Sequence, residues 1–310
     1  MSNPNFDALL STTLANYRDQ LTDNVFTARP LTYFLQDKGR IRMLNGGTKI
    51  VEPLIYGTNS TVASYSGYDS LSLTPQTGIT AAEYDWKQYA ASITISGIEE
   101  AKNNGEQEVI NLLEAKIMQA EESMREGFNQ MFFGDGTGNS GKNWNGLANL
   151  VEASGTVGGI DRSTASWWRS YENNSAGALT LAKMATAYNS VSVGNDHPDM
   201  ILTTQTLYEK YEALLQPNLR YTDTRTADAG FQNLLFKAAP VVYDVHCDTG
   251  VMYVLNSKYL TLVGHSSKWF AQTQFVQPED VDARYALIMC YGNLTCRNAA
   301  KQGKLTAQTA

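Results

Sequence analysis

The sequence lacks the features that mark secreted, disulfide-linked or membrane-spanning proteins. Its three cysteines, Cys247, Cys290 and Cys296, are odd in number and have no paired spacing, which argues against a disulfide framework. The N-terminal stretch MSNPNFDALL contains no basic segment followed by an apolar run, so we see no secretory signal. No stretch approaches the roughly 20 apolar residues that span a bilayer. These absences indicate folding in a reducing cytoplasm.

No region of the chain is rich in charges of one sign. The chain has 24 basic and 31 acidic residues, a net charge of −7, and no run of like charges. Proteins that grip nucleic acid usually carry a clustered Lys/Arg stripe, so tight nucleic-acid binding is not expected. At 310 residues the chain has room for about two domains.

Signatures of common enzyme classes are missing or misplaced. Gly136, Gly138 and Gly141 match a dinucleotide fingerprint, but they follow an expected helix C-terminus, where the dipole repels anions. We therefore interpret these glycines as a loop. No G-x-S-x-G elbow occurs, and a carboxylate pair of the glycosidase type remains possible because carboxylates are scattered.

Candidate metal and nucleophile residues are few. His197, His246 and His265 are widely spaced, with no HExxH or CxxC motif, so a zinc site has little to build on. His246 and Cys247 are sequence neighbours, which on a strand point to opposite faces and cannot form a nucleophile–base pair. We expect no catalytic residue, no cofactor and no metal. Trp167, Trp168 and Tyr171 could stack on a sugar or base, but packing at a domain edge is the preferred interpretation.

One long amphipathic helix is predicted over Glu106–Phe133. Its apolar residues recur at steps of three and four: Val109, Leu113, Ile117, Ala120, Met124, Phe128 and Met131. The pattern predicts that Ile117 and Met124 are buried. It also predicts that Glu114, Glu121 and Glu122 are more exposed.

A two-stranded arm is predicted before this helix. Thr48–Tyr56 and Glu83–Ser96 have strand patterns, and Gly57–Gly78 joins them with only one charge, Asp69. A lone ribbon is marginal in water, so the arm needs another surface to lie on. The residues expected to contact another subunit are Leu54, Tyr56, Tyr65, Tyr68, Leu71 and Leu73.

The rest of the chain predicts an α+β fold with an antiparallel or mixed sheet. A helix over residues 5–29 should end before Pro30, and a short helix should follow at Leu31–Leu35. Helices are expected at Ala178–Val191 and Thr206–Leu215. The expected strands are Met200–Thr203, Ala239–Val245, Val251–Leu255, Tyr259–Val263 and Ala283–Arg297.

This order resembles the major capsid protein family of tailed bacteriophages, whose fold herpesviruses share. Gly46–Leu54 is similar to the entry of that family's extended loop, and Trp86–Tyr89 through Ile95–Glu99 to its exit into the spine helix. Phe132–Gly138 with Gly146-Leu147 resembles the segment after the spine. Met252–Asn256 and Tyr291–Leu294 resemble its late strands. The resemblance covers nearly the whole chain and rests on the ordered series of motifs.

The resemblance implies a domain plan and a function. It implies an N-terminal arm (1–44), an extended loop (45–96), a peripheral domain with the spine helix (97–164 and 276–310) and an axial domain (165–275). The function implied is that of a major capsid protein, a shell subunit and not an enzyme. It would self-assemble as hexamers and pentamers into an icosahedral head around double-stranded DNA. Assembly would take place in the bacterial host cytoplasm, with scaffolding, portal and possibly decoration proteins as partners and without a membrane.

Two features depart from one branch of that family. That branch carries a long scaffolding segment removed by a protease, whereas this arm begins almost at Met1, which implies a separate scaffolding protein or a processed form. The branch also cross-links a loop lysine to an asparagine, but no lysine lies between Lys49 and Lys87. The alternatives are an encapsulin-like compartment shell and a soluble enzyme.

Overall fold

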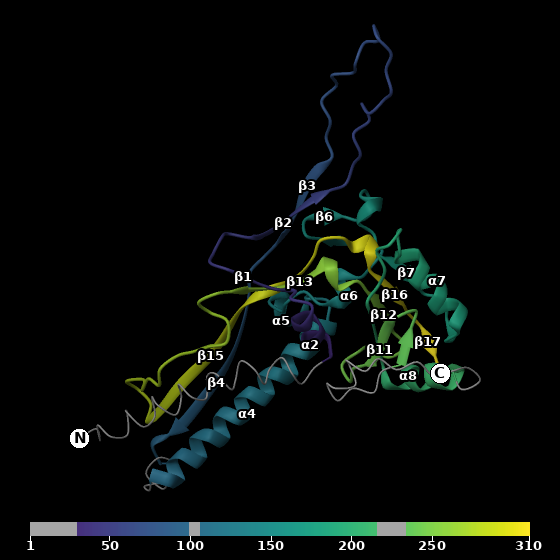
Figure 1. The fold of residues 1–310 in the computed structure, drawn as a ribbon. Coiled ribbons are helices and arrows are strands. Elements are labelled where there is room, and N and C mark those ends of the chain that lie inside the picture. The colour runs from purple at the N-terminus through teal and green to yellow at the C-terminus, as the bar shows by residue number, and fades with distance from the viewer. Residues whose placement is uncertain (1–29, 99–105, 216–233) are drawn as a thin grey trace.

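The computed structural model describes residues 30–98, 106–215 and 234–310. Two sheets form a body, and a two-stranded arm projects from it (Figure 1). The predicted helix over residues 5–29 lies outside the described residues. Pro30 opens a helix, because its fixed φ suits the first helical position.

The described part of the chain contains the following elements. The helices and 3₁₀ turns are α2 (Pro30–Asp37), α4 (Glu106–Phe133), α5 (Gly138–Gly141), α6 (Leu147–Leu150), η1 (Ser166–Trp168), α7 (Leu181–Val191), α8 (Gln205–Leu215), η2 (Ser257–Tyr259) and η3 (Ala299–Lys301). The earlier strands are β1 (Ile41–Leu44), β2 (Ile50–Ile55), β3 (Ile79–Tyr84), β4 (Lys87–Ser96), β5 (Thr156–Val157), β6 (Ile160–Asp161), β7 (Tyr171–Asn173), β8 (Gly177–Ala178) and β9 (Met200–Thr203). The later strands are β10 (Leu234–Phe236), β11 (Ala239–Tyr243), β12 (Met252–Leu255), β13 (Leu260–His265), β14 (Ala271–Gln272), β15 (Ala283–Cys296), β16 (Gly303–Leu305) and β17 (Gln308–Thr309).

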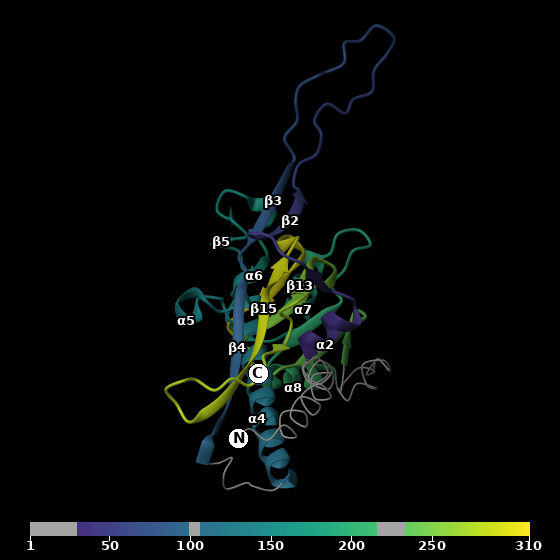
Figure 2. The same ribbon diagram turned by 90° about the vertical axis from the view of Figure 1, so that its left-hand side faces the viewer.

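The first sheet is built on the long strand β15. It has the order β1-β13-β15-β14, and β4 pairs with β15 antiparallel from Ala283↔Ser96 to Gly292↔Lys87. Helix α4 runs alongside β4 and β15 down one side of the body (Figures 1 and 2). Tyr89 of β4 packs its ring 6.0 Å from that of Phe128 on α4, which ties the helix to the sheet.

The α4 bounds are those predicted, and its apolar stripe faces the core. Ile117 and Met124 are 1% and 2% exposed, which confirms the predicted orientation, and Glu122 is exposed as expected. The expected exposure of Glu121 is wrong, because this residue is buried at the margin of the stripe. Its carboxylate accepts a hydrogen bond from Arg125 Nη2 at 3.0 Å, one turn later, so the charge is paired. Glu114 lies in the part of α4 whose side chains are not described.

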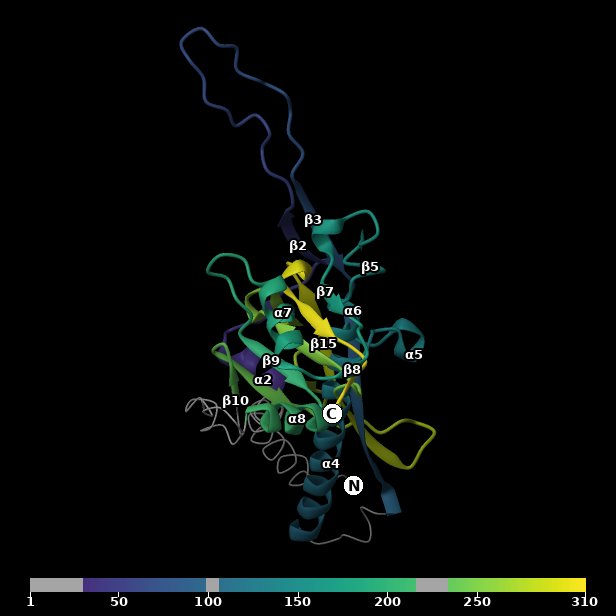
Figure 3. The ribbon, with the colours of Figure 1, turned by 90° about the vertical axis from the view of Figure 1, so that its right-hand side faces the viewer.

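The second sheet is mixed, as predicted, with the order β10-β11-β9-β12-β16-β7. Its strands pack on both faces. On β9, Ile201 joins a core with α7 and α8, while Met200 and Leu202 join the larger core that contains α4. Figure 3 looks onto the side of the body that carries α7 and α8, and Figure 1 shows that β4 and β15 lie on the opposite side. Burial on both faces explains why β9, β11 and β12 are continuous apolar runs.

The predicted strand pairing of the arm is wrong in one respect. The return strand is β3, whereas β4, expected as part of the same strand, leaves the arm and pairs with β15. Asp85 and Trp86 separate the two strands, and the Trp86 indole donates to the carbonyl oxygen of Gly47 at 2.9 Å. The projecting ribbon is therefore shorter than predicted, and the strand next to α4 belongs to the body.

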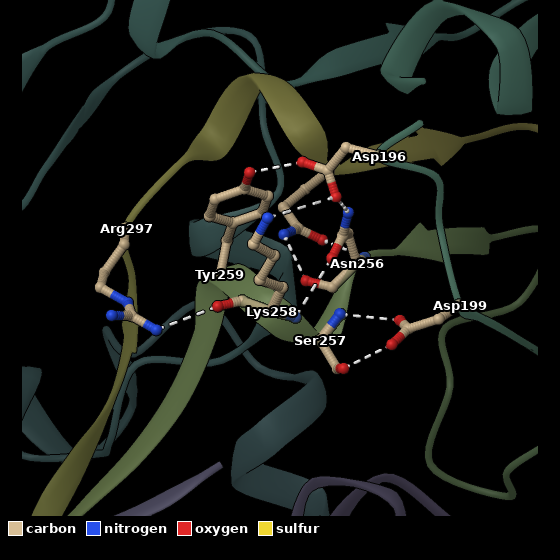
Figure 4. Close-up of polar contacts among 8 residues, drawn as sticks. Asp196, Asp199, Asn256, Ser257, Lys258, Tyr259 and Arg297 are labelled. Atoms are coloured by element: carbon tan, nitrogen blue, oxygen red, sulfur yellow. Dashed lines mark hydrogen bonds and ion pairs between the residues drawn. The ribbon is translucent and has the colours of Figure 1, made fainter. Parts of the chain in front are cut away.

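A polar junction joins the two sheets where β12 passes through η2 into β13 (Figure 4). Asp199 accepts from the backbone N–H of Ser257 at 2.8 Å and from its hydroxyl at 2.5 Å. Asp196 accepts from Asn256 Nδ2 at 3.0 Å and from the Tyr259 hydroxyl. The two aspartates lie in the loop that precedes β9, and their hydrogen bonds hold in place the turn that links the two sheets. We call Asp196, Asp199, Asn256, Ser257 and Tyr259 the polar junction.

Candidate assembly surface

The root of the arm is an antiparallel pair with one face against the body. β2 pairs with β3 from Ile50↔Tyr84 to Ile55↔Ile79. Burial alternates along β2, as the two-residue period of a strand requires, so Ile50, Glu52 and Leu54 face inward. The opposite face exposes the large apolar side chains of Val51 (48%), Ile55 (82%) and Ile79 (77%).

Buried polar groups fix this root to the body. Glu52 is 1% exposed, and its carboxylate lies 3.0 Å from Arg42 Nη2 and accepts from the Thr295 hydroxyl at 3.3 Å. The Tyr84 hydroxyl donates to the carbonyl oxygen of Cys296 at 2.8 Å. Burial raises the pKa of Tyr84, so its hydroxyl keeps its proton at neutral pH. These bonds hold both strands of the root against the end of β15.

Aromatic and charged contacts at the surface complete the attachment. The ring of Tyr56 stacks on Trp167 with centroids 5.0 Å apart and planes 16° apart. Lys49 Nζ lies 2.9 Å from a carboxylate oxygen of Glu83, across the ribbon. The hydrogen bond with Glu83 and its charge raise the pKa of Lys49. The arm therefore leaves the body in a defined direction (Figure 1).

Beyond the root, the tip between Gly57 and Gly78 carries apolar side chains without a core. Val62, Tyr65, Leu71 and Leu73 are 83%, 66%, 59% and 92% exposed, and Tyr68 is fully exposed. Asp69 is the single charge in this range, and it accepts from the backbone N–H of Ser66 at 2.8 Å. Several exposed large apolar groups on one projecting segment are typical of an interaction surface.

The six predicted contact residues divide into three groups. Tyr65, Tyr68, Leu71 and Leu73 lie together on the tip and are exposed, so they are available to a partner. Tyr56 is 41% exposed and uses one face of its ring on Trp167. Leu54 is a correction: it is 6% exposed because the alternation of β2 turns its side chain into the chain's own core.

Four other apolar residues of the arm are exposed and were not predicted from the sequence: Val51, Ile55, Val62 and Ile79. The alternation along Ile50–Ile55 was a usable signal for Val51 and Ile55, because a strand with one buried face presents every second residue outward. Ile79 could be found only with the pairing register, since it lies opposite Ile55. We call the tip residues Val62, Tyr65, Tyr68, Leu71 and Leu73 the tip cluster.

The other motifs have structural roles. Gly138–Gly141 forms a left-handed turn after α4, with φ near +55° at Asn139 and Ser140, which agrees with a loop. Trp168 is buried and its indole donates to the Val157 carbonyl oxygen at 3.2 Å, so its ring packs inside the protein, while the placement at a domain edge stays a prediction. His246 lies 2.9 Å from Glu126 on α4, away from the Cys247 thiol, which contacts the Val251 carbonyl oxygen.

No cluster suited to a metal ion is found among residues 30–98, 106–215 and 234–310. In the same ranges no helix is long and apolar enough to cross a membrane. The three cysteines are free and buried, and burial raises the pKa of each thiol, that of Cys296 to about 12. Thiols held protonated in this way are poor nucleophiles.

Comparison with known proteins finds similarity at the level of structure. No family model matches the sequence, and no curated protein matches it significantly. The capsid of cyanophage A-1(L) matches with a TM-score of 0.65 and 17% identity, covering 89% of this chain and 93% of that chain. The SrpI encapsulin of Synechococcus elongatus matches with a TM-score of 0.58 and 10% identity, covering 89% and 88%. The procapsid of satellite phage P4 matches with a TM-score of 0.54 and 11% identity, covering 94% and 90%. The chain has the α+β fold of phage major capsid proteins, which encapsulins share.

Proposed function

We propose that this chain is the major capsid protein of a tailed bacteriophage, which self-assembles as hexamers and pentamers into an icosahedral head enclosing double-stranded DNA. The observation that carries the proposal is the capsid fold over 89% of the chain, together with an arm whose tip cluster has no core in its own subunit. A shell protein is the class in which both features have a use. A catalytic role has no comparable support.

The domain plan of the proposal follows the same fold. Residues 97–164 and 276–310, which include α4 and β15, would form a peripheral domain. Residues 165–275, which include every strand of the second sheet except β16, would form an axial domain near the hexamer and pentamer axes. The arm would lie on the neighbouring subunit of the same ring. All five residues of the polar junction lie within residues 165–275, so it would fix the turn from β12 to β13 inside the axial domain.

A second candidate is an encapsulin-like compartment, favoured by the likeness to the SrpI encapsulin. Both candidates need the same subunit contacts, and they differ in the contents of the shell. The absence of a basic stripe in the sequence suits either one, because a DNA-filled head does not require sequence-specific binding. Scaffolding, portal and decoration proteins in a bacterial host cytoplasm would accompany only the phage head.

Electron microscopy of particles tests the proposal. The chain should be expressed alone and together with the products of its neighbouring genes, and the purified material imaged after nuclease treatment. Closed shells that protect double-stranded DNA support the phage head, whereas shells that hold protein cargo and no DNA support the compartment. A chain that stays monomeric under both conditions contradicts both candidates.

A further inference from the structure

Strand β4 forms an open edge of the first sheet. It pairs with β15 alone among the described residues, over all ten of its residues. Gly97 donates from its backbone N–H to the carbonyl oxygen of Asp282 at 2.8 Å, which continues the ladder by one pair. In an antiparallel ladder every second residue bonds to the partner strand, so the odd-numbered residues of β4 bond to β15.

The even-numbered residues Gln88, Ala90, Ser92 and Thr94 therefore turn their backbone N–H and C=O groups away from β15. Lys116 on α4 supports this assignment, because its amine donates to the Thr94 carbonyl oxygen at 2.9 Å from outside the sheet. Within the described part of the chain, the outward backbone groups of Gln88, Ala90 and Ser92 have no hydrogen-bond partner.

Between Gln88 and Ser92 this edge lacks the charges, prolines and bulges that usually protect against strand addition. Natural edges are kept short or carry charges, prolines or bulges. From Gln88 to Thr94 the strand has no charge and no proline, and its outward side chains are small, with Ala90, Ser92 and Thr94 exposed. At about 3.4 Å per residue, ten residues offer roughly 34 Å of edge.

The tip of the arm contains a segment that fits such an edge. Ser70-Leu71-Ser72-Leu73-Thr74 alternates polar and apolar residues, which is the pattern of a strand with one buried face. Among the described residues, no backbone–backbone hydrogen bond involves this segment. The Thr74 carbonyl oxygen accepts from Gln76 Nε2 at 3.1 Å. Apart from that bond the segment has an unpaired backbone and a side-chain pattern for a sheet, but no sheet of its own.

The side chains and charges around the β4 edge suit the tip segment Ser70–Thr74. Tyr89 and Ile93 point toward α4, so an added strand would place its own alternate side chains over the same helix. On α4, Ser123 lies two turns after Lys116 on the same face and is exposed, so a small side chain there leaves room beside the edge. The space at Gly127, one turn later, is filled by the Tyr89 hydroxyl, which would lie 2.1 Å from a Cβ at that position. The charges beside the edge, Lys87 and Lys116, are opposite in sign to Asp69.

We propose that Ser70–Thr74 of one subunit adds as a strand to the open edge of β4 in a second copy of this chain, with Leu71 and Leu73 toward α4. The proposal rests on the proposed shell function and names the surface that receives the arm. Backbone hydrogen bonds would supply the attachment, as in other cases of strand addition. Leucine burial beside Ser123 would set the register.

Proline at an outward position tests the backbone bonds directly. Ser92→Pro removes an N–H that faces the open edge and keeps the ladder with β15, because edge strands tolerate proline where the N–H faces outward. The matched control is Ser92→Ala, which changes the same side chain and keeps the N–H. We expect Ser92→Pro to lower the yield of shells at least tenfold relative to Ser92→Ala, with the same circular dichroism spectrum.

Cysteine pairs give a second measurement that does not depend on how well Ser92→Pro folds. Ser72→Cys in one preparation is mixed, before assembly, with Ala90→Cys, Ser92→Cys or Thr94→Cys in another, and the shells are oxidised. Since Ser72 would share a face with these three residues, one pairing should give a cross-linked dimer on non-reducing gels. The native cysteines are buried and should not interfere.

The outcomes separate this proposal from the shell function itself. Shells from Ser92→Pro at the control yield, or shells without a cross-link in any of the three pairings, overturn strand addition and leave the shell function standing. A cross-link of Ser92→Cys with itself would instead show two β4 edges paired with each other. If the unmodified chain forms no shells under any condition, the failure lies with the proposed function.

Discussion

The tip cluster predicts a variant that folds but assembles poorly. Replacing both Leu71 and Leu73 by serine removes two exposed apolar side chains from the arm and leaves its root unchanged. Fully burying a leucine contributes about 1.5–3 kcal/mol relative to leaving it exposed. Leu71 and Leu73 are 59% and 92% exposed in the subunit. The free energy that each can gain on burial is therefore the full leucine value multiplied by its exposed fraction. The pair would then contribute about 2–5 kcal/mol per arm contact.

That free energy has a measurable consequence. At about 1.4 kcal/mol per factor of ten, the contact should weaken by roughly one to three orders of magnitude, and the protein concentration needed for shell formation should rise accordingly. The free energy of unfolding should change by no more than about 0.5 kcal/mol, because neither side chain packs in the subunit core. Light scattering against concentration measures the first quantity, and urea unfolding followed by circular dichroism measures the second.

The control for this variant lies in the same segment. Ser70→Ala with Ser72→Ala changes the alternate residues and removes no large apolar side chain, so it should assemble like the unmodified chain. If the leucine variant assembles at the same concentration as this control, the tip cluster is not an assembly contact. A leucine variant that unfolds at clearly lower urea would show that these side chains serve their own subunit instead.

The remaining predictions concern the body of the subunit. Ile117→Ala should lower the free energy of unfolding by about 2–5 kcal/mol, whereas its half-exposed neighbour Met118→Ala should cost no more than about 0.5 kcal/mol in the same urea titration; equal losses would contradict the α4 orientation. Gly146→Ala should cost about 1–3 kcal/mol, because a Cβ there would lie 2.2 Å from the carbonyl oxygen of Gly134, and an unchanged urea midpoint would refute this close approach. Burial raises the pKa of Asp196, but bonds from Tyr259 and Asn256 outweigh it and the net pKa is lowered. The junction should therefore stabilise the fold above pH about 3.9 and lose this contribution as the pH falls below it, and Asp196→Asn should flatten the acid limb of a stability–pH curve. Mature shells should run as a single monomer band on denaturing gels, because no lysine lies between Lys49 and Lys87, and a ladder that survives boiling and reductant would disprove this.

Local periodicity predicted the long elements well and the pairing of strands poorly. Helix α4 was bounded correctly because its stripe continues without a break over about six turns and a glycine follows Phe133. The split between β3 and β4 was missed because both segments alternate and Asp85-Trp86 contains no glycine or proline, the strongest turn signals. The partner of β4 lies about 190 residues away in β15, and no local pattern carries that information.

Local sequence patterns also failed to predict the burial of several single residues. Leu54 and Leu73 have the same chemical character, yet one is in the core and the other is exposed, because the root of the arm touches the body and the tip does not. Glu121 is buried because Arg125 lies beside it at the edge of the helix stripe. Gly146 has an ordinary extended backbone, and its need for glycine comes only from carbonyl groups at the end of α4.

The buried root of the arm and its exposed tip cluster together affect how strongly subunits associate. Association costs free energy for every segment that must be ordered, so a freely moving loop contributes little to a contact. Here the buried Glu52 and Tyr84 and the stacked Tyr56 fix the direction of the arm within the free subunit, so part of that ordering is complete before subunits meet. Loosening the root by Tyr84→Phe, which removes the hydroxyl bonded to Cys296 and keeps the ring, should therefore weaken assembly although Tyr84 is buried and touches no partner. Unchanged assembly of this variant, with its fold intact, would show that the direction of the arm is set on the shell rather than in the subunit.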